Sequence, residues 1–183
     1  MKSKNKDEAQ KAVQKFGEIE KNPISLPDDY AKQIIELLNK DLASHFTLFY
    51  QFKKQHWIVE GPDWKHISKS LDEYAEKNLE LADEIAERIS LTGGIPASNP
   101  SRFEELSYVQ FEGEDKYDLR TMLENDLKAE QQIITSIRER VDFAKENGDH
   151  GLDDLLKDVL EDQEEIAHEL HHYLEGESLE KSI

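Results

Sequence analysis

Cysteine is absent from this chain of 183 residues, which excludes disulfide bonds and thiolate metal sites. Any metal ion must therefore be bound by His, Asp or Glu side chains. Long hydrophobic runs are missing too, since no segment reaches the ~18 apolar residues that span a bilayer. The charged first residues have no apolar stretch after them, so a secretory signal is not expected. We expect a cytoplasmic protein without membrane contact.

Positive charge is scarce as well. The chain has 23 Lys and Arg against 41 Asp and Glu, a net charge of −18. This balance disfavours a general nucleic-acid surface, which needs clustered Lys and Arg, and it favours the attraction of cations. Most of the acids are expected to be solvated surface groups. Only their spacing can single out individual metal ligands.

The few Gly and Pro residues separate segments with a helical hydrophobic period. The first predicted helix begins at Pro27 and ends before Gly61, and the second runs from Pro62 to about Leu91. Residues 95–117 lack a sustained period and predict a long crossover with a short helix near 102–106. Two more helices are expected at about 118–146 and 152–174.

This pattern predicts an all-α protein, a four-helix bundle with a long crossover between its second and third long helices, the connection of ferritin-like bundles. We expect the bundle to occupy residues 25–176. Residues 1–24 are rich in Lys and poor in large apolar residues, which predicts a flexible N-terminal tail, and residues 177–183 are expected to form a C-terminal tail.

A row of acids marks the second predicted helix. Asp83 and Glu87 are four residues apart beside the apolar stripe, so both can reach one ion. Asp72 lies ~16 Å from Asp83 along the axis and cannot join it within one chain. A second copy of the helix, antiparallel across a two-fold axis, would bring Asp72 to the other two. The alternative is a solvated helix shoulder, because Glu76 and Glu80 lie on roughly the same side.

Histidine supplies the candidate nitrogen ligands. His56 ends the first helix on a line of residues that faces inward, although a histidine there is more often a hydrogen-bonded core residue. His45 lies on the same line, ~16 Å from His56. It can therefore serve only a separate site or pack in the core.

One motif is more specific than these patterns. His56-Trp57-Ile58-Val59-Glu60-Gly61 is followed by Trp64, by Leu71-Asp72, and by Asp83-Glu84-Ile85-Ala86-Glu87-Arg88 before Gly93-Gly94. Tyr117-Asp118-Leu119-Arg120 and Tyr173-Leu174-Glu175 agree with it. In order and spacing this resembles the Dps family of mini-ferritins, with some likeness to its archaeal and cyanobacterial members. The resemblance covers residues 26–176.

The resemblance implies a homo-oligomer, a dodecameric shell built from two-fold dimers, with ferroxidase sites between subunits. His56 and Asp72 of one subunit would bind iron together with Asp83 and Glu87 of its partner. Fe(II) would be oxidised to Fe(III), with hydrogen peroxide as the usual oxidant and dioxygen as an alternative, and stored as ferric mineral in an acid-lined cavity. Such a protein protects against oxidative stress. Zinc is a candidate competitor for the histidines.

The sequence departs from the family pattern at Ser68, where members commonly have a second histidine. His66 is close in sequence, but it lies on a different side of the helix. The other candidates are on the last helix, where His168 and His172 are expected as further metal ligands and His171 lies between them. The alternative is a polar helix face with surface imidazoles.

Two other functions remain open. One is a di-iron centre within a single bundle, as in bacterioferritin or rubrerythrin, because Glu165–His168 and Glu169–His172 have the Glu-x-x-His spacing; the second helix lacks this motif. The other is a non-catalytic, DNA-compacting Dps homologue whose N-terminal lysines contact phosphates. The acids in that tail offset most of its lysines, so DNA binding is expected to be weak or absent.

Overall fold

The computed structural model describes residues 12–175, and within them the only regular elements are five α-helices. In chain order they are α1 (Asp28–Ile58), α2 (Trp64–Leu91), α3 (Pro100–Leu106), α4 (Leu119–Glu146) and α5 (His150–Glu175). The predicted all-α, ferritin-like bundle with its long crossover is confirmed. No helix of the described part is long and apolar enough to cross a membrane.

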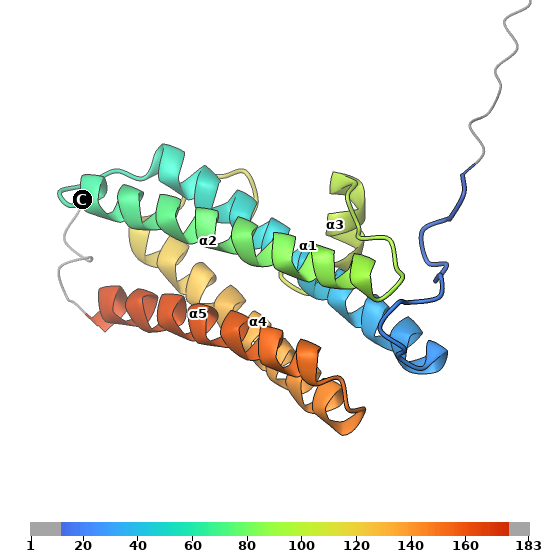
Figure 1. Cartoon of the computed structure of the whole chain (residues 1–183). Coiled ribbons are helices and arrows are strands. Elements are labelled where there is room, and N and C mark those ends of the chain that lie inside the picture. Colours follow the sequence, from blue (N-terminus) through green and yellow to red (C-terminus); the bar gives the residue numbers. More distant parts are fainter. Residues whose placement is uncertain (1–11, 176–183) are drawn as a thin grey trace, which may run out of the picture.

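The four long helices form two antiparallel hairpins that pack on each other (Figure 1). One hairpin is α1 with α2 and the other is α4 with α5, while the short α3 packs on α1. Apolar residues from all four long helices fill the space between the hairpins; the largest fully buried ones include Phe52, Leu42, Ile85, Ile133 and Leu123. The hairpin turns place residues of equal sequence distance from a turn at the same level of the bundle.

Local side-chain chemistry explains where the helices begin. The Asp118 carboxylate accepts a hydrogen bond from the Thr121 backbone N–H at 3.0 Å, which caps α4 as predicted. The Asn99 side chain accepts from the Ser101 N–H at 3.1 Å and caps α3, whose first residue is Pro100. These caps satisfy backbone donors that have no partner within the helix.

Gly93 ends α2 and also receives the N-terminal segment. Its φ of +96° is a left-handed conformation, and a Cβ added there would lie 2.3 Å from the Glu20 carbonyl oxygen. The Glu20 N–H and the Gln14 side-chain amide both donate to the Gly93 carbonyl, each at 2.9 Å. Of the tail predicted at 1–24, residues 1–11 lie outside the described residues, as does the C-terminal tail predicted at 177–183.

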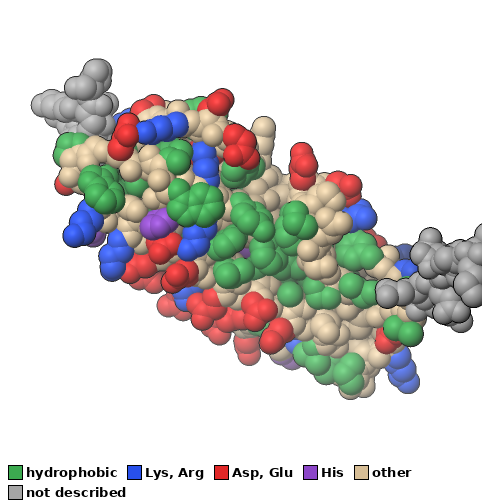
Figure 2. Space-filling view, turned by 90° about the horizontal axis from the view of Figure 1, so that it is seen from above, with side chains coloured by type: hydrophobic (Ala, Val, Ile, Leu, Met, Phe, Trp, Pro, Cys, Tyr) green, Lys and Arg blue, Asp and Glu red, His purple; other side chains and the backbone are tan. Residues whose placement is uncertain are grey.

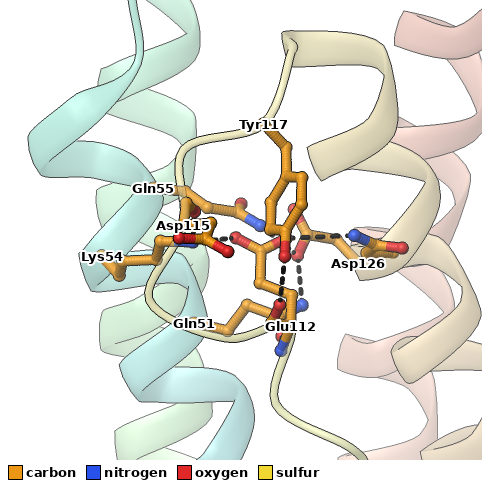
Figure 3. A network of polar contacts seen from close by, with 8 residues as sticks. Gln51, Lys54, Gln55, Glu112, Asp115, Tyr117 and Asp126 are labelled. Carbon is orange, nitrogen blue, oxygen red and sulfur yellow. Dashed lines mark hydrogen bonds and ion pairs between the residues drawn. The ribbon is translucent and has the colours of Figure 1, made fainter.

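A buried polar network joins α1 to the crossover and to α4 (Figure 3). The Lys54 ammonium pairs with Glu112 at 2.9 Å, and the side-chain amides of Gln51 and Gln55 donate to one oxygen of Asp126 at 2.7 and 2.9 Å. Burial raises the pKa of Asp126 to about 8, although both amide hydrogen bonds act in the opposite direction. The network fixes the position of the crossover against the bundle.

Candidate metal centre

The His56 imidazole is held in one orientation by α2. Its Nδ1 lies 2.8 Å from the Ser68 carbonyl oxygen and 3.0 Å from the Ser68 hydroxyl. A carbonyl oxygen can only accept, so Nδ1 carries the proton and donates it to this oxygen. The other ring nitrogen, Nε2, therefore keeps its lone pair. This is the usual arrangement of a histidine that binds a metal, in which a second hydrogen bond fixes the tautomer.

Asp72 lies one helical turn after Ser68 and faces this lone pair. Its Oδ1 is 3.9 Å from His56 Nε2, and the same oxygen pairs with the Lys53 ammonium from α1. The hydrogen bond from Lys53 lowers the pKa of Asp72. The carboxylate is therefore charged at neutral pH. We call this pair of candidate metal ligands, the His56 imidazole nitrogen and the Asp72 carboxylate, the half-site.

Asp83 and Glu87 are not brought to this half-site. Both are exposed on α2, and the rise of an α-helix puts Asp83 ~16 Å from Asp72. In residues 12–175, no group of three or more His, Asp and Glu side chains is placed to hold a metal ion. The prediction that one chain cannot unite Asp72 and Asp83 agrees with this geometry.

A shallow apolar groove lies next to Asp83. Phe46, Leu79, Ala82 and Ala86 line it together with Asp83, and the charged residues Glu73, Glu76, Lys77 and Glu80 complete the lining. The position of Asp83 beside the apolar stripe is thus as predicted. Hydrophobic side chains gather along the face of the α1–α2 layer, with a band of acids beside them (Figure 2).

Two tryptophans add to the exposed apolar surface near the half-site. Trp57, which follows His56, is 73 % exposed, and Trp64 at the start of α2 is 52 % exposed. Single exposed apolar residues are ordinary, but large aromatic side chains close to a half-formed site are typical of protein interfaces.

The histidines of α5 form a separate group. The Nε2 atoms of His168 and His172 are 3.1 Å apart, and the rings of His171 and His172 lie 3.3 and 3.5 Å from oxygens of Glu175. In the described part of the chain, no hydrogen bond or ion pair joins these residues to His56 or Asp72. His66 bonds to the Tyr173 hydroxyl at 3.0 Å and does not take the place of the family's second histidine.

The alternative of a di-iron centre inside one bundle does not fit these α5 residues. Glu165, His168, Glu169 and His172 are exposed, so neither Glu-x-x-His motif faces the core. Glu169 instead accepts a hydrogen bond from the Tyr74 hydroxyl at 2.5 Å. The Glu-x-x-His motifs are present in the sequence, but their residues lie on the exposed side of α5 and cannot form a metal centre in the core.

Two residues of the half-site were not assigned by the sequence. Ser68 was identified only as a departure from the family pattern, and the structure shows that its carbonyl and hydroxyl orient His56. Lys53 had no predicted role, yet it pairs with the candidate ligand Asp72. The only available signal was spacing, since Lys53 precedes His56 by almost one turn and Ser68 precedes Asp72 by one turn.

Comparison with known proteins agrees with the fold and with the motif. The family model of the ferritin-like domain matches residues 35–179. The "DNA protection during starvation protein" of Halobacterium salinarum is 39% identical over 164 residues, which are 89% of this chain and 90% of that protein. The "nutrient stress-induced DNA-binding protein" of a Nostoc species is 35% identical over 172 residues, 94% of each chain.

Solved structures of related proteins have the same fold as this chain. The archaeal Dps homologue of Halobacterium salinarum superposes with a TM-score of 0.86 at 38% identity, covering 94% of each chain. DpsC from Streptomyces coelicolor gives a TM-score of 0.87 at 30% identity, covering 90% of this chain and 96% of its own. From fold, motif and these relatives together, the chain belongs to the Dps family of ferritin-like proteins.

Proposed function

We propose that this protein binds Fe(II) at sites shared by two subunits, oxidises it there, and stores the ferric product inside a dodecameric shell. The observation that carries the proposal is the half-site of His56 and Asp72, which has its ligands oriented and finds no third His, Asp or Glu ligand among residues 12–175. Asp83 and Glu87 have the complementary property, since they are exposed carboxylates four residues apart on α2, and Asp83 lines the groove next to it. A two-fold axis that pairs antiparallel α2 helices supplies both halves twice per dimer.

The donor set suits both oxidation states of iron. The neutral His56 imidazole binds Fe(II), and the hard carboxylates of Asp72, Asp83 and Glu87 favour Fe(III) once it forms. With hydrogen peroxide, two Fe(II) each lose one electron, the O–O bond breaks, and two Fe(III) and two hydroxide ions result. Dioxygen serves as the alternative oxidant, with four Fe(II) supplying the four electrons for its reduction to water. Removing both peroxide and Fe(II) protects against oxidative damage.

Lys53 acts in this proposal as the resident counter-ion of Asp72. When Fe(II) arrives, the ammonium must leave the carboxylate oxygen. The ion pair therefore keeps Asp72 charged and positioned, and it weakens Fe(II) binding by competition. His168 and His172 have two ring nitrogens close together on the surface, and we propose them as a secondary site at which zinc competes with iron.

Co-assembly of two inactive variants tests the shared site. One variant carries His56→Ala and Asp72→Ala, and the other carries Asp83→Ala and Glu87→Ala. Each shell alone is expected to have lost fast Fe(II) oxidation. When the two are refolded together, half of the two-fold dimers are mixed and each mixed dimer regains one of its two sites, so about a quarter of wild-type activity should return.

The matched control is Glu76→Ala with Glu80→Ala, two exposed acids on the same helix, which should leave oxidation unchanged. Stopped-flow absorbance of ferric product measures the rate, and light scattering verifies the assembled shell. Mixed shells that stay inactive would show that the two halves do not complete one another. Full oxidation by the Asp83→Ala, Glu87→Ala shell would place the centre elsewhere.

A further inference from the structure

Polar side chains from all four long helices are fully buried near the middle of the bundle, within about one helical turn of one another. These are His45 of α1, Asn78 of α2, Glu130 of α4 and Gln163 of α5, each with 0% exposure. His45 and Asn78 are hydrogen-bonded to each other, and the Asn78 amide also lies close enough to interact with the Glu130 carboxyl. Glu130 lies 16 residues before the end of α4 and Gln163 lies 13 residues after the start of α5, so in that hairpin they are within about one helical turn of each other.

Several polar atoms of this layer have no hydrogen-bond partner. They are Nε2 of His45, both carboxyl oxygens of Glu130, and both amide atoms of Gln163. Polar groups in a protein interior are normally paired, because leaving one unpaired costs the loss of its hydration. A layer of three such side chains in the middle of an apolar core therefore offers several polar atoms to a bound ligand.

The hydrogen bonds around His45 fix which nitrogen is available. The Asn78 amide nitrogen donates to the Tyr74 carbonyl oxygen at 3.1 Å, so the amide oxygen of Asn78 faces His45. Nδ1 of His45 lies 3.0 Å from that oxygen and must donate to it, which leaves a lone pair on Nε2. Burial lowers the pKa of His45 to about 4, so the ring is neutral and can bind a metal.

Acceptors outnumber donors among the unpartnered atoms. When Glu130 is ionised, its two oxygens accept, as do His45 Nε2 and the Gln163 amide oxygen, and the Gln163 amide nitrogen is the one donor among these atoms. Burial raises the pKa of Glu130 well above its usual range, and the Asp126 carboxyl adds to the rise, so without a compensating cation this carboxyl keeps its proton. A cation satisfies the acceptors and compensates the carboxylate in one step. Neutral ligands do not provide both.

We propose that each subunit binds one divalent transition-metal ion inside its own bundle, through His45 Nε2, the Glu130 carboxylate and the Gln163 amide oxygen. This nitrogen and oxygen set suits Fe(II), Mn(II) or Zn(II). Only two of its ligands are His or acidic residues, which agrees with the finding that the described residues contain no group of three. The site lies ~16 Å from His56 along α1 and requires a single chain, so it is independent of the shared centre.

Cobalt(II) is the probe, because its visible absorption reports nitrogen and oxygen coordination. The assay uses full-length shells in a background that removes the surface ligands: Asp72→Asn, Asp83→Asn, Glu87→Gln and His172→Ala. We expect this background to bind one Co(II) per subunit with a visible spectrum and a raised Tm. Adding Glu130→Gln, which keeps the shape of the side chain, should weaken that binding at least about tenfold and abolish the Tm shift.

The matched control is Asp142→Asn, an exposed acid on the same helix, which should bind Co(II) like the background. If Glu130→Gln prevents assembly, His45→Gln replaces it and should cause the same loss of affinity and spectrum. Equal Co(II) binding and equal Tm shifts with and without the substitution would overturn the proposal. So would a background shell without a visible Co(II) spectrum, which would leave the layer occupied by water and protons.

Discussion

At the scale of single residues, Lys53 determines how strongly the half-site attracts its first ion. Its ammonium pairs with the Asp72 oxygen that is closest to His56. Lys53→Gln removes both the competing cation and its repulsion of Fe(II), while Asp72 stays charged at neutral pH because a free carboxyl titrates near 4. We expect Fe(II) to bind about two- to fivefold more tightly, the range set by a partly exposed ion pair.

The Fe(II) dependence of the oxidation rate measures this effect. Lys69→Gln is the control, since Lys69 forms an exposed ion pair with Glu73 on α2 and is not part of the half-site. Tightening by Lys53→Gln alone would support the role of Lys53. An unchanged or weakened Fe(II) response would mean that Lys53 does not compete with the ion.

His56 shows what a sequence can and cannot reveal at this scale. Its residue type and its place before Trp57 identified it as a candidate ligand. The partner that orients it is the backbone carbonyl of Ser68. Every residue has a backbone carbonyl, so the residue type at position 68 does not reveal this contact. The replacement of the usual histidine by Ser68 was recognisable in the sequence, but the hydrogen bonds by which Ser68 holds the His56 ring were not.

At the scale of helices, Asp126 connects α4 to α1 and makes stability depend on pH. In the folded chain its carboxyl keeps a proton up to about pH 8, whereas the reference value is 3.8. Between these values the folded state binds more protons than the unfolded state, so stability falls as pH rises. Asp126→Asn keeps an oxygen that can accept hydrogen bonds from Gln51 and Gln55. It removes the titrating carboxyl and with it this pH-dependent contribution to the free energy of unfolding.

The free energy of unfolding at pH 6.5 and pH 8.0 tests this, at one subunit concentration and without metal. Asp41 and His45 have pKa values of about 6 and about 4, so they contribute little in this window. Asp126→Asn is expected to lose less stability across it than the wild type, by about 1 kcal/mol. Parallel pH profiles for the two proteins would contradict the raised pKa.

The helix boundaries were predictable because short-range chemistry fixes them. Asp118 caps α4 and Gly93 ends α2, and both residue types are specific for those positions. The buried polar layer of the bundle was not predictable. The helical period of the sequence does not distinguish Asn78, Glu130 and Gln163 from exposed polar residues. Only the packing of the four helices shows that all three side chains are buried in the same core. His45 alone gave a hint, because it lay on an apolar line far from His56.

At the scale of the whole molecule, the net charge of −18 bears on nucleic acid. The relatives from Halobacterium salinarum and Nostoc carry names that refer to DNA. Strong DNA binding requires several Lys or Arg contacts to phosphates, and the lysines of residues 1–24 belong to a chain with 41 Asp and Glu against 23 Lys and Arg. We expect no mobility shift of duplex DNA at physiological salt. A robust shift that disappears when residues 1–24 are deleted would contradict this expectation.

A two-fold dimer could be proposed from the sequence because Asp72 and Asp83 are too far apart on a single helix to bind one ion. The number of subunits in the shell could not be predicted, because it depends on contacts between subunits that a single chain does not show. The motif supplied the dodecamer only as a property of the family.

The two exposed tryptophans give the proposed assembly an optical consequence. Trp57 and Trp64 are the only indoles in the chain, and they flank the connection between α1 and α2 beside the half-site. Their fluorescence therefore reports on one small region of the protein and on nothing else. Docking of a neighbour or arrival of a paramagnetic ion can be followed there in the unlabelled wild-type protein.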